Sequence, residues 1–141
     1  MADYVNDAKG NPLKRSGGAN AAGFPQYTVW ENTFDSAERN LLAADTVSEF
    51  LTIPANTVVQ GVYLEVLEGE AAVTVDVGDA ADPNGWVAAQ SAAAAGVFAG
   101  GGVYAATGKL YTAETDLSFA VAGAAATVAR FRVVVVGVNL G

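Results

Sequence analysis

The sequence predicts an all-β protein, a β-sandwich for which a jelly roll is one suitable topology, preceded by an extended N-terminal arm. Short runs rich in Val, Thr and aromatic residues alternate between apolar and polar side chains, as half-buried strands do. Turn-forming residues recur about every 8–12 residues, and no stretch keeps a helical period. The 141 residues fit one domain. We therefore expect an arm over residues 1–25 and a sandwich domain over residues 26–141.

The arm is predicted from its turn-forming residues. Gly10-Asn11-Pro12, Gly17-Gly18 and Gly23-Phe24-Pro25 favour turns and extended backbone over helix or sheet. Such a segment is either an unstructured terminus or an arm that orders on a neighbouring subunit. In the second interpretation, its contact residues are Tyr4, Leu13, Lys14, Arg15 and Phe24.

The first predicted strands follow directly. Residues 27–34 mix Tyr, Thr, Val, Trp and Phe, all of which favour strands. Residues 35–44 are the one helix-like stretch, and we expect a short turn of helix or a loop there. Residues 46–53 are predicted to be a strand, because Pro54-Ala55-Asn56 ends the run.

The next two strands predict a hairpin. Residues 58–67 and 72–77 both alternate with period two, and the turn-forming Glu68-Gly69-Glu70 separates them. The side chains expected to face the core are Val58, Val62, Leu64 and Val66 in the first strand, and Val73, Val75 and Val77 in the second.

A long loop is expected over residues 78–96. Its Ala-rich end, residues 87–95, could form a helical turn, because Ala has the highest helix propensity. Residues 97–104 and 109–112 are weaker strand candidates. A clear strand follows, in which Leu117, Phe119 and Val121 alternate with smaller residues.

The last predicted strand covers residues 127–138. Arg130 and Arg132 share one face and Phe131 lies on the other, but from Val133 to Val136 both faces are apolar. A strand that is apolar on both faces is either central in a sandwich or covered by a neighbouring subunit. We therefore expect Val134 or Val136 to contact a second sheet or a neighbouring subunit.

The composition favours a protein that hides its surface in an assembly. Only 16% of residues are charged and 52% are hydrophobic, whereas an ordinary domain has about 25% charged residues. The net charge is −8, made of +1 in residues 1–25 and −9 in the remainder. Such a chain lacks the basic surface that nucleic-acid binding requires. It also shows no export signal at its start and no membrane span.

The residue types argue against an enzyme. The chain has no Cys and no His, so Ser–His and Cys–His pairs and the usual zinc ligands are excluded. A Ser–Lys pair is formally open, but Lys9, Lys14 and Lys109 lie in no known motif. The acidic residues between Glu65 and Asp82 are best explained as surface carboxylates rather than a glycosidase pair. We predict no catalytic residue, no metal and no cofactor.

The acidic loop and the Trp that follows it have two interpretations each. Asp79 and Asp82 could bind Ca²⁺, but they lack the spacing of an EF-hand loop, so turn formation by these side chains is favoured. Trp86 could be a ligand platform or an interface anchor. We favour the interpretation that it fixes the loop onto the sandwich.

The stretch between residues 50 and 95 resembles small virion structural proteins of tailed phages. The resemblance rests on Ile53-Pro54-Ala55-Asn56-Thr57-Val58-Val59 with the strand that continues to Val66, followed by Val75-Asp76-Val77-Gly78-Asp79-Ala80-Ala81-Asp82-Pro83-Asn84-Gly85-Trp86. It implies a β-sandwich on the outside of the capsid, a decoration or cement protein without catalytic residues, with a homotrimer favoured. It further implies synthesis in the host cytoplasm and the major capsid protein or other virion proteins as partners.

Two alternatives stay open. A carbohydrate-binding module of a fibre or adhesin would use an exposed aromatic platform, at Trp86 or Tyr104, or a Ca²⁺ site at Asp79 and Asp82. A neck or tail component of the same particle would have a similar sequence.

Overall fold

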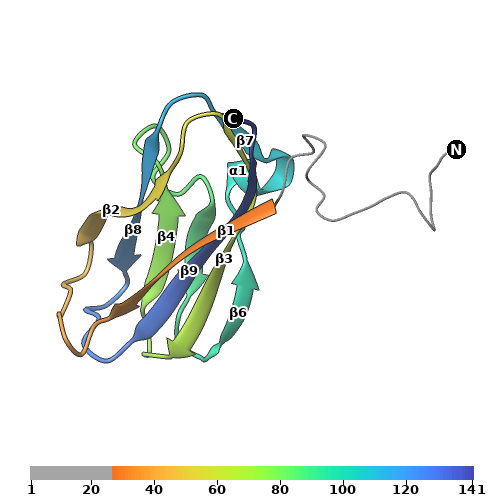
Figure 1. Ribbon diagram of the computed structural model, residues 1–141. Helices are drawn as coiled ribbons and strands as arrows, with labels where there is room; N and C mark the ends of the chain where they lie inside the picture. The colour runs from red at the N-terminus through yellow and green to blue at the C-terminus, as the bar shows by residue number, and fades with distance from the viewer. Residues whose placement is uncertain (1–26) are drawn as a thin grey trace, which may run out of the picture.

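The computed structural model describes residues 27–141, which form a sandwich of two antiparallel sheets (Figure 1). The elements in chain order are β1 (Tyr27–Asp35), β2 (Thr46–Ile53), β3 (Thr57–Glu68), β4 (Thr74–Gly78), β5 (Val87–Ser91), β6 (Gly96–Ala99), α1 (Val103–Thr107), β7 (Lys109–Tyr111), β8 (Thr115–Ala122) and β9 (Arg130–Asn139). The predicted all-β sandwich is confirmed.

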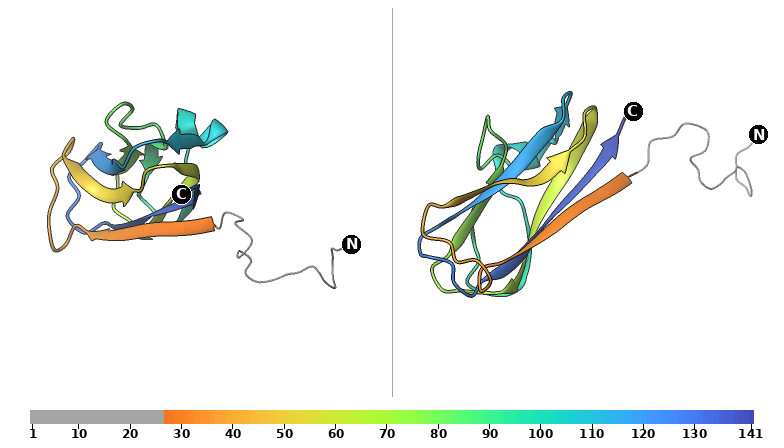
Figure 2. Two further views of the ribbon diagram at one scale, coloured as in Figure 1. Left: turned by 45° about the horizontal axis from the view of Figure 1, so that its top comes forward. Right: turned by 60° about the vertical axis from the view of Figure 1, so that its left-hand side comes forward.

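The strand order is that of a jelly roll. One sheet has the order β1-β9-β3-β6, with the short β7 also paired to β3, and the other has the order β2-β8-β4-β5. Leaving β7 aside, each sheet therefore has four strands, as in a double Greek key. Figure 2 shows β1 and β9 side by side, and Tyr27 pairs with Val138, so the start of β1 lies beside the end of β9.

The core lies between the two sheets and is made of Val, Leu and Phe side chains. At its centre the ring of Phe119 in β8 lies 5.0 Å from the ring of Phe131 in β9. The ring of Phe34 in β1 lies 5.2 Å from that of Phe119. These edge-on contacts join both sheets, and burial of each such ring contributes about 1.5–3 kcal/mol.

The predicted hairpin is wrong, because β3 and β4 lie in different sheets. The inward faces of two facing strands alternate in the same way as the shared face of a hairpin, so the Val pattern fits both arrangements. The turn between them packs elsewhere: the N–H of Glu70 donates to the carbonyl of Ala92. A Cβ on Gly69 would lie 2.4 Å from the carbonyl oxygen of Ala93, so this turn has no room for a side chain.

Several local predictions also need correction. Val58 does not face the core, because a bulge between Val59 and Gly61 shifts the register; Val59 is buried in its place. The Ala-rich end of the long loop forms β5, since its backbone pairs with the open edge of β4. The strand predicted over residues 97–104 stops at Ala99, and Val103 and Tyr104 belong to α1. Within residues 27–141 no helix is long and apolar enough to cross a membrane.

A carboxylate ties two of the connections at one end of the sandwich. Glu70, in the turn after β3, accepts hydrogen bonds from the N–H groups of Thr127, Val128 and Ala129 and from the hydroxyl of Thr127. The bond from Val128 is the largest cause that lowers the pKa of Glu70, to about 2. This carboxylate is therefore a structural cap that anchors the entry into β9.

Candidate interaction surface

The outer face of the β1-β9-β3-β6 sheet is apolar. In β9 the odd-numbered Val133 and Val135 are buried against the second sheet, and the even-numbered Val134 and Val136 point outward and are half-buried. Their neighbours across the sheet are Val29 beside Val136 and Tyr63 beside Val134. We call this surface the valine face. Its residues are Tyr27, Val29, Val58, Tyr63, Val134, Val136 and Val138.

The valine face is exposed in residues 27–141. Tyr27 is 68% exposed, Val29 55% and Tyr63 39%. Val97 on β6 and Leu110 on β7 extend the apolar area and are also exposed. Neighbouring apolar side chains on a protein surface mark a contact site more often than isolated ones do.

A charged cluster borders the valine face at one end. The guanidinium of Arg132 on β9 donates to Glu65 on β3 from both Nε and Nη2, with the Nε–Oε1 distance 2.8 Å. Its Nη1 lies 3.3 Å from Glu31 Oε1 on β1. The two carboxylates pair with Arg132, one of the two arginines on this face of β9, and the cluster forms a polar rim next to an apolar centre, as in many interfaces.

The opposite outer face, on the β2-β8-β4-β5 sheet, has a different chemistry. Its outward positions carry small or polar side chains: Thr46, Thr52, Thr74, Asp76, Asp116, Ser118, Ala120 and Ala122. No large apolar side chain lies among them. The sandwich therefore has one face suited to water and one suited to a partner.

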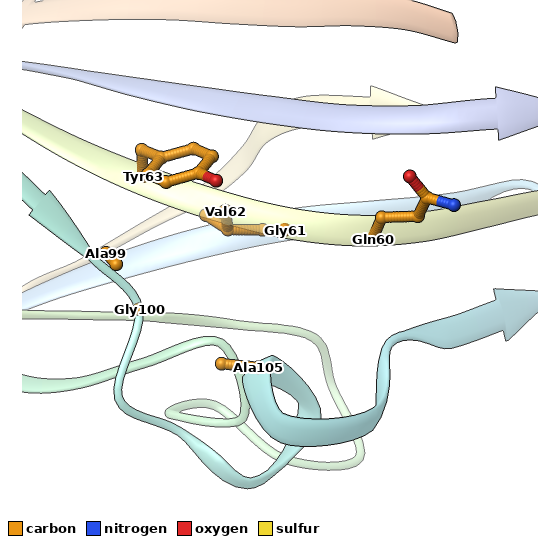
Figure 3. A pocket seen from close by; sticks show the side chains of 7 residues that line it. All are labelled: Gln60, Gly61, Val62, Tyr63, Ala99, Gly100 and Ala105. Carbon is orange, nitrogen blue, oxygen red and sulfur yellow. The ribbon is translucent and has the colours of Figure 1, made fainter.

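A shallow hollow lies beside the valine face (Figure 3). It measures about 100 Å³ and is lined by Gln60, Gly61, Val62, Tyr63, Ala99, Gly100 and Ala105. It forms where β6 has ended and β7 has not begun, so that β3 lacks a full neighbour between these strands. Figure 3 shows the ring of Tyr63 beside the bulge in β3, and a Cβ on Gly61 would lie 3.5 Å from this ring.

At the end of the sandwich opposite Glu70, Asp79 fixes the acidic loop. Asp79 is only 3% exposed. Its Oδ1 accepts the N–H of Asp82 at 2.9 Å, and its Oδ2 accepts from the hydroxyl of Tyr111 at 2.8 Å and from the ammonium of Lys109 at 3.0 Å. The Tyr111 hydroxyl in turn accepts the indole N–H of Trp86 at 2.9 Å.

The network shifts the pKa values of its members. Burial alone would raise the pKa of Asp79, but the Asp82 N–H, the Tyr111 hydroxyl and the Lys109 ammonium outweigh burial and hold it below its usual value. The Tyr104 hydroxyl and Asp79 raise the pKa of Lys109. Burial raises the pKa of Tyr111. Asp79 and Lys109 are therefore an ion pair at neutral pH.

This geometry decides between interpretations of the loop. Both oxygens of Asp79 already hold donors, including an ammonium group, and the bond from Asp82 confirms the turn-forming role of Asp79. Trp86 is 0% exposed, which confirms that it fixes the loop onto the sandwich. Residues 27–141 contain no group of three or more His, Cys, Asp or Glu residues arranged to bind a metal.

The predicted contact residues fall into two groups. Tyr4, Leu13, Lys14, Arg15 and Phe24 lie outside the described residues. Val134 and Val136 lie on the valine face and not against the second sheet, which removes one of the two expected environments. Sequence reasoning missed Tyr27, Val29 and Tyr63, because each lies in a strand whose partners could be identified only from the sheet order.

Comparison with known proteins finds the same fold in chains of phage capsid structures. No family model and no curated protein sequence matches it. Among solved structures, a chain of the capsid of Ralstonia phage GP4 has a TM-score of 0.61 and 21% identity over 90% of this chain and 92% of its own. A chain of the cyanophage Pam1 capsid asymmetric unit has a TM-score of 0.54 and 23% identity, over 95% of this chain and 96% of its own. A chain of the acidic stable capsid of Helicobacter pylori bacteriophage KHP30 has a TM-score of 0.55 and 12% identity, over 84% of this chain and 95% of its own. At these identities the likeness establishes the fold.

Proposed function

We propose that this protein is a structural virion protein that decorates or cements the outside of a tailed-phage capsid, with a homotrimer as the favoured state. The observation that carries the proposal is the valine face, an apolar sheet surface that the sandwich itself does not cover. Exposing such a surface to water costs free energy, and burial against a partner removes that cost.

The fold comparisons support a virion role of this kind. Each of the three matched capsid chains is covered over more than nine-tenths of its own length, at 92%, 96% and 95%. The matched chains are therefore about as short as this one. A short jelly roll is suited to a coat on an existing shell, where many copies bind at once and weak single contacts suffice.

The carbohydrate-binding alternative loses the residues on which it depended. Trp86 is completely buried. Tyr104 is half-buried: its ring packs against Trp86 with 5.4 Å between ring centroids, and the Lys109 ammonium lies 4.1 Å from its ring centroid. Neither ring is the exposed platform that this alternative requires.

Cryo-electron microscopy of the phage that encodes the chain tests the proposal. We expect density for the jelly roll on the outer surface of the capsid, with the valine face turned toward a neighbouring protein and the face around Ser118 turned toward solvent. Density at the neck or tail, or a valine face open to solvent on the particle, would contradict it.

A further inference from the structure

One edge of β1 pairs with β9. On its other edge a side chain covers the second half of the strand, and the first half is uncovered in residues 27–141. β1 pairs with β9 over nine consecutive residues without a bulge, and its other edge has no strand partner in residues 27–141. Near its end, the side chain of Asn32 donates to the carbonyl of Phe50 in the other sheet and accepts the N–H of Thr33. Asn32 thus occupies the edge from residue 32 onward.

The first half of β1, Tyr27–Glu31, has no such protection. The N–H of Thr33 donates to the Asn32 side chain and so points away from β9. Every second residue of a strand directs its N–H and C=O groups to the same side. The backbone groups of Tyr27, Val29 and Glu31 therefore line the free edge. Edge strands are normally guarded by Pro, charged side chains or a bulge. Residues 27–30 have none of these and Glu31 is the only charge of the segment, while Tyr27, Thr28 and Val29 are exposed in succession.

The charge of the chain indicates what would pair with this edge. Residues 27–141 carry four basic and thirteen acidic residues, a net of −9, so two copies of the domain repel each other. Residues 1–26 carry three basic and two acidic residues, a net of +1. The arm is thus the only part of the chain with a charge complementary to the domain, and Lys14 and Arg15 lie together within it.

The length and the attachment point of the arm fit the same occupant. The arm joins the domain at Tyr27, the first residue of the open edge. Extended, 25 residues reach about 80 Å, whereas the radius of gyration of a domain of this size is about 13 Å. An arm of this length can leave its own domain and cross that of a neighbour.

We infer that the open edge of β1, Tyr27–Glu31, is completed by the arm of a second copy of this chain. The stretch Leu13-Lys14-Arg15 lies along it, with backbone pairing to β1, so that Leu13 and Arg15 share the outer face and Arg15 comes near Glu31. Leu13 then extends the valine face beyond Val29. Pro12 fits the first position of such a strand, where an N–H is not needed. The inference concerns copies of this chain and does not depend on the capsid role.

Disulfide trapping in the full-length protein tests this contact, because the chain has no Cys of its own. One copy carries Leu13→Cys and the other Val29→Cys, an exposed position where the change does not disturb the core. Mixed under mild oxidation, they should give a disulfide-linked heterodimer at least about tenfold above the pair Leu13→Cys and Ala88→Cys. Ala88 is the matched control, exposed on the edge strand of the other sheet.

Charge reversal and chain linkage complete the test. Lys14→Glu with Arg15→Glu in the Leu13→Cys copy should reduce the heterodimer about fivefold or more, as should high salt. If the two mixed copies give no heterodimer, but a single chain carrying both Cys residues closes on itself in dilute solution, the arm binds its own domain and the inference is wrong. Equal trapping at Val29 and Ala88, or none at either, also overturns it.

Discussion

Glu70 shows how a single side chain can hold two loops. The sequence suggested a surface carboxylate in a tight turn, whereas Glu70 accepts three backbone N–H groups of the segment before β9. No pattern in the sequence joins residue 70 to residues 127–129, because the contact exists only once both sheets have formed.

The low pKa of Glu70 leads to a pH-dependent prediction. Since the folded pKa, about 2, lies below the unfolded value, the stabilisation is fully present above about pH 4.5 and is lost as pH falls toward 2. Glu70→Gln should lower the free energy of unfolding at pH 7 by about 1–2 kcal/mol, after allowance for solvent screening. Chemical denaturation should show the difference from wild type vanish near pH 2. Glu68→Gln, at the exposed end of β3, is the control and should change stability little. A pH-independent difference would contradict the cap.

The Asp79 network gives a second prediction at this scale. Asp79→Ala leaves the Tyr111 hydroxyl without its acceptor and the Lys109 ammonium without its carboxylate partner, and should cost about 2–4 kcal/mol. Asp82→Ala should change stability by less than about 0.5 kcal/mol, because Asp82 takes part in the turn through its backbone. EDTA should leave the melting temperature of the wild type unchanged within about one degree. Equal losses from both variants, together with a lower melting temperature in EDTA, would indicate a Ca²⁺ site.

At the scale of single strands, the sequence of β9 predicted burial in the core, but not which strands lie beside it. The run Val133–Val136 indicated burial on both faces, and Val133 and Val135 are indeed buried in the core. The sequence could not say that β1 and β3 flank β9 on each side and that the other face stays open, because pairing partners are set by the sheet order. The same limit explains the wrong hairpin between β3 and β4.

The valine face yields a prediction for β9. Val134→Asp places a charge on the half-buried outer face, so the domain should fold, but attachment to the particle should fall by more than about tenfold because the charge would be buried without a partner. Co-sedimentation with particles that lack the protein measures this, and circular dichroism checks the fold. Ser118→Asp, on the outer face of the other sheet, is the matched control and should bind as wild type does. Wild-type attachment of Val134→Asp would show that the valine face is not the contact.

At the scale of the whole molecule, the sequence predicted the fold class better than the strand order and the contacts. Turn spacing and period-two patterns were enough for a β-sandwich, because both depend on local backbone chemistry. The boundary at residue 25 and the role of the arm stay predictions. They depend on partners that the chain meets only in an assembly.

Deletion of residues 1–23 is the prediction that belongs to this scale. If the arm orders only on a partner, it adds no core to the domain, and at low protein concentration the melting temperature should stay within about two degrees of wild type. Attachment to particles should nonetheless weaken, and Phe24→Ala should show part of the effect, because aromatic anchors carry a large share of many interfaces. Melting curves and particle occupancy measure the two effects. Unfolding of the truncated protein would make the arm part of the sandwich, and wild-type occupancy would remove its role in attachment.

The central place of β9 in its sheet also determines when the protein can fold. β1 and β3 pair with β9 and not with each other, and β9 is made after all the other strands. In a nascent chain that lacks residues 130–139, the edges of β1 and β3 that pair with β9 are therefore without a partner strand. The sheet can close only after synthesis has passed residue 139, and pairing between such distant segments is slow. We therefore expect newly made copies to expose unpaired strand edges until β9 has inserted, and such edges favour aggregation.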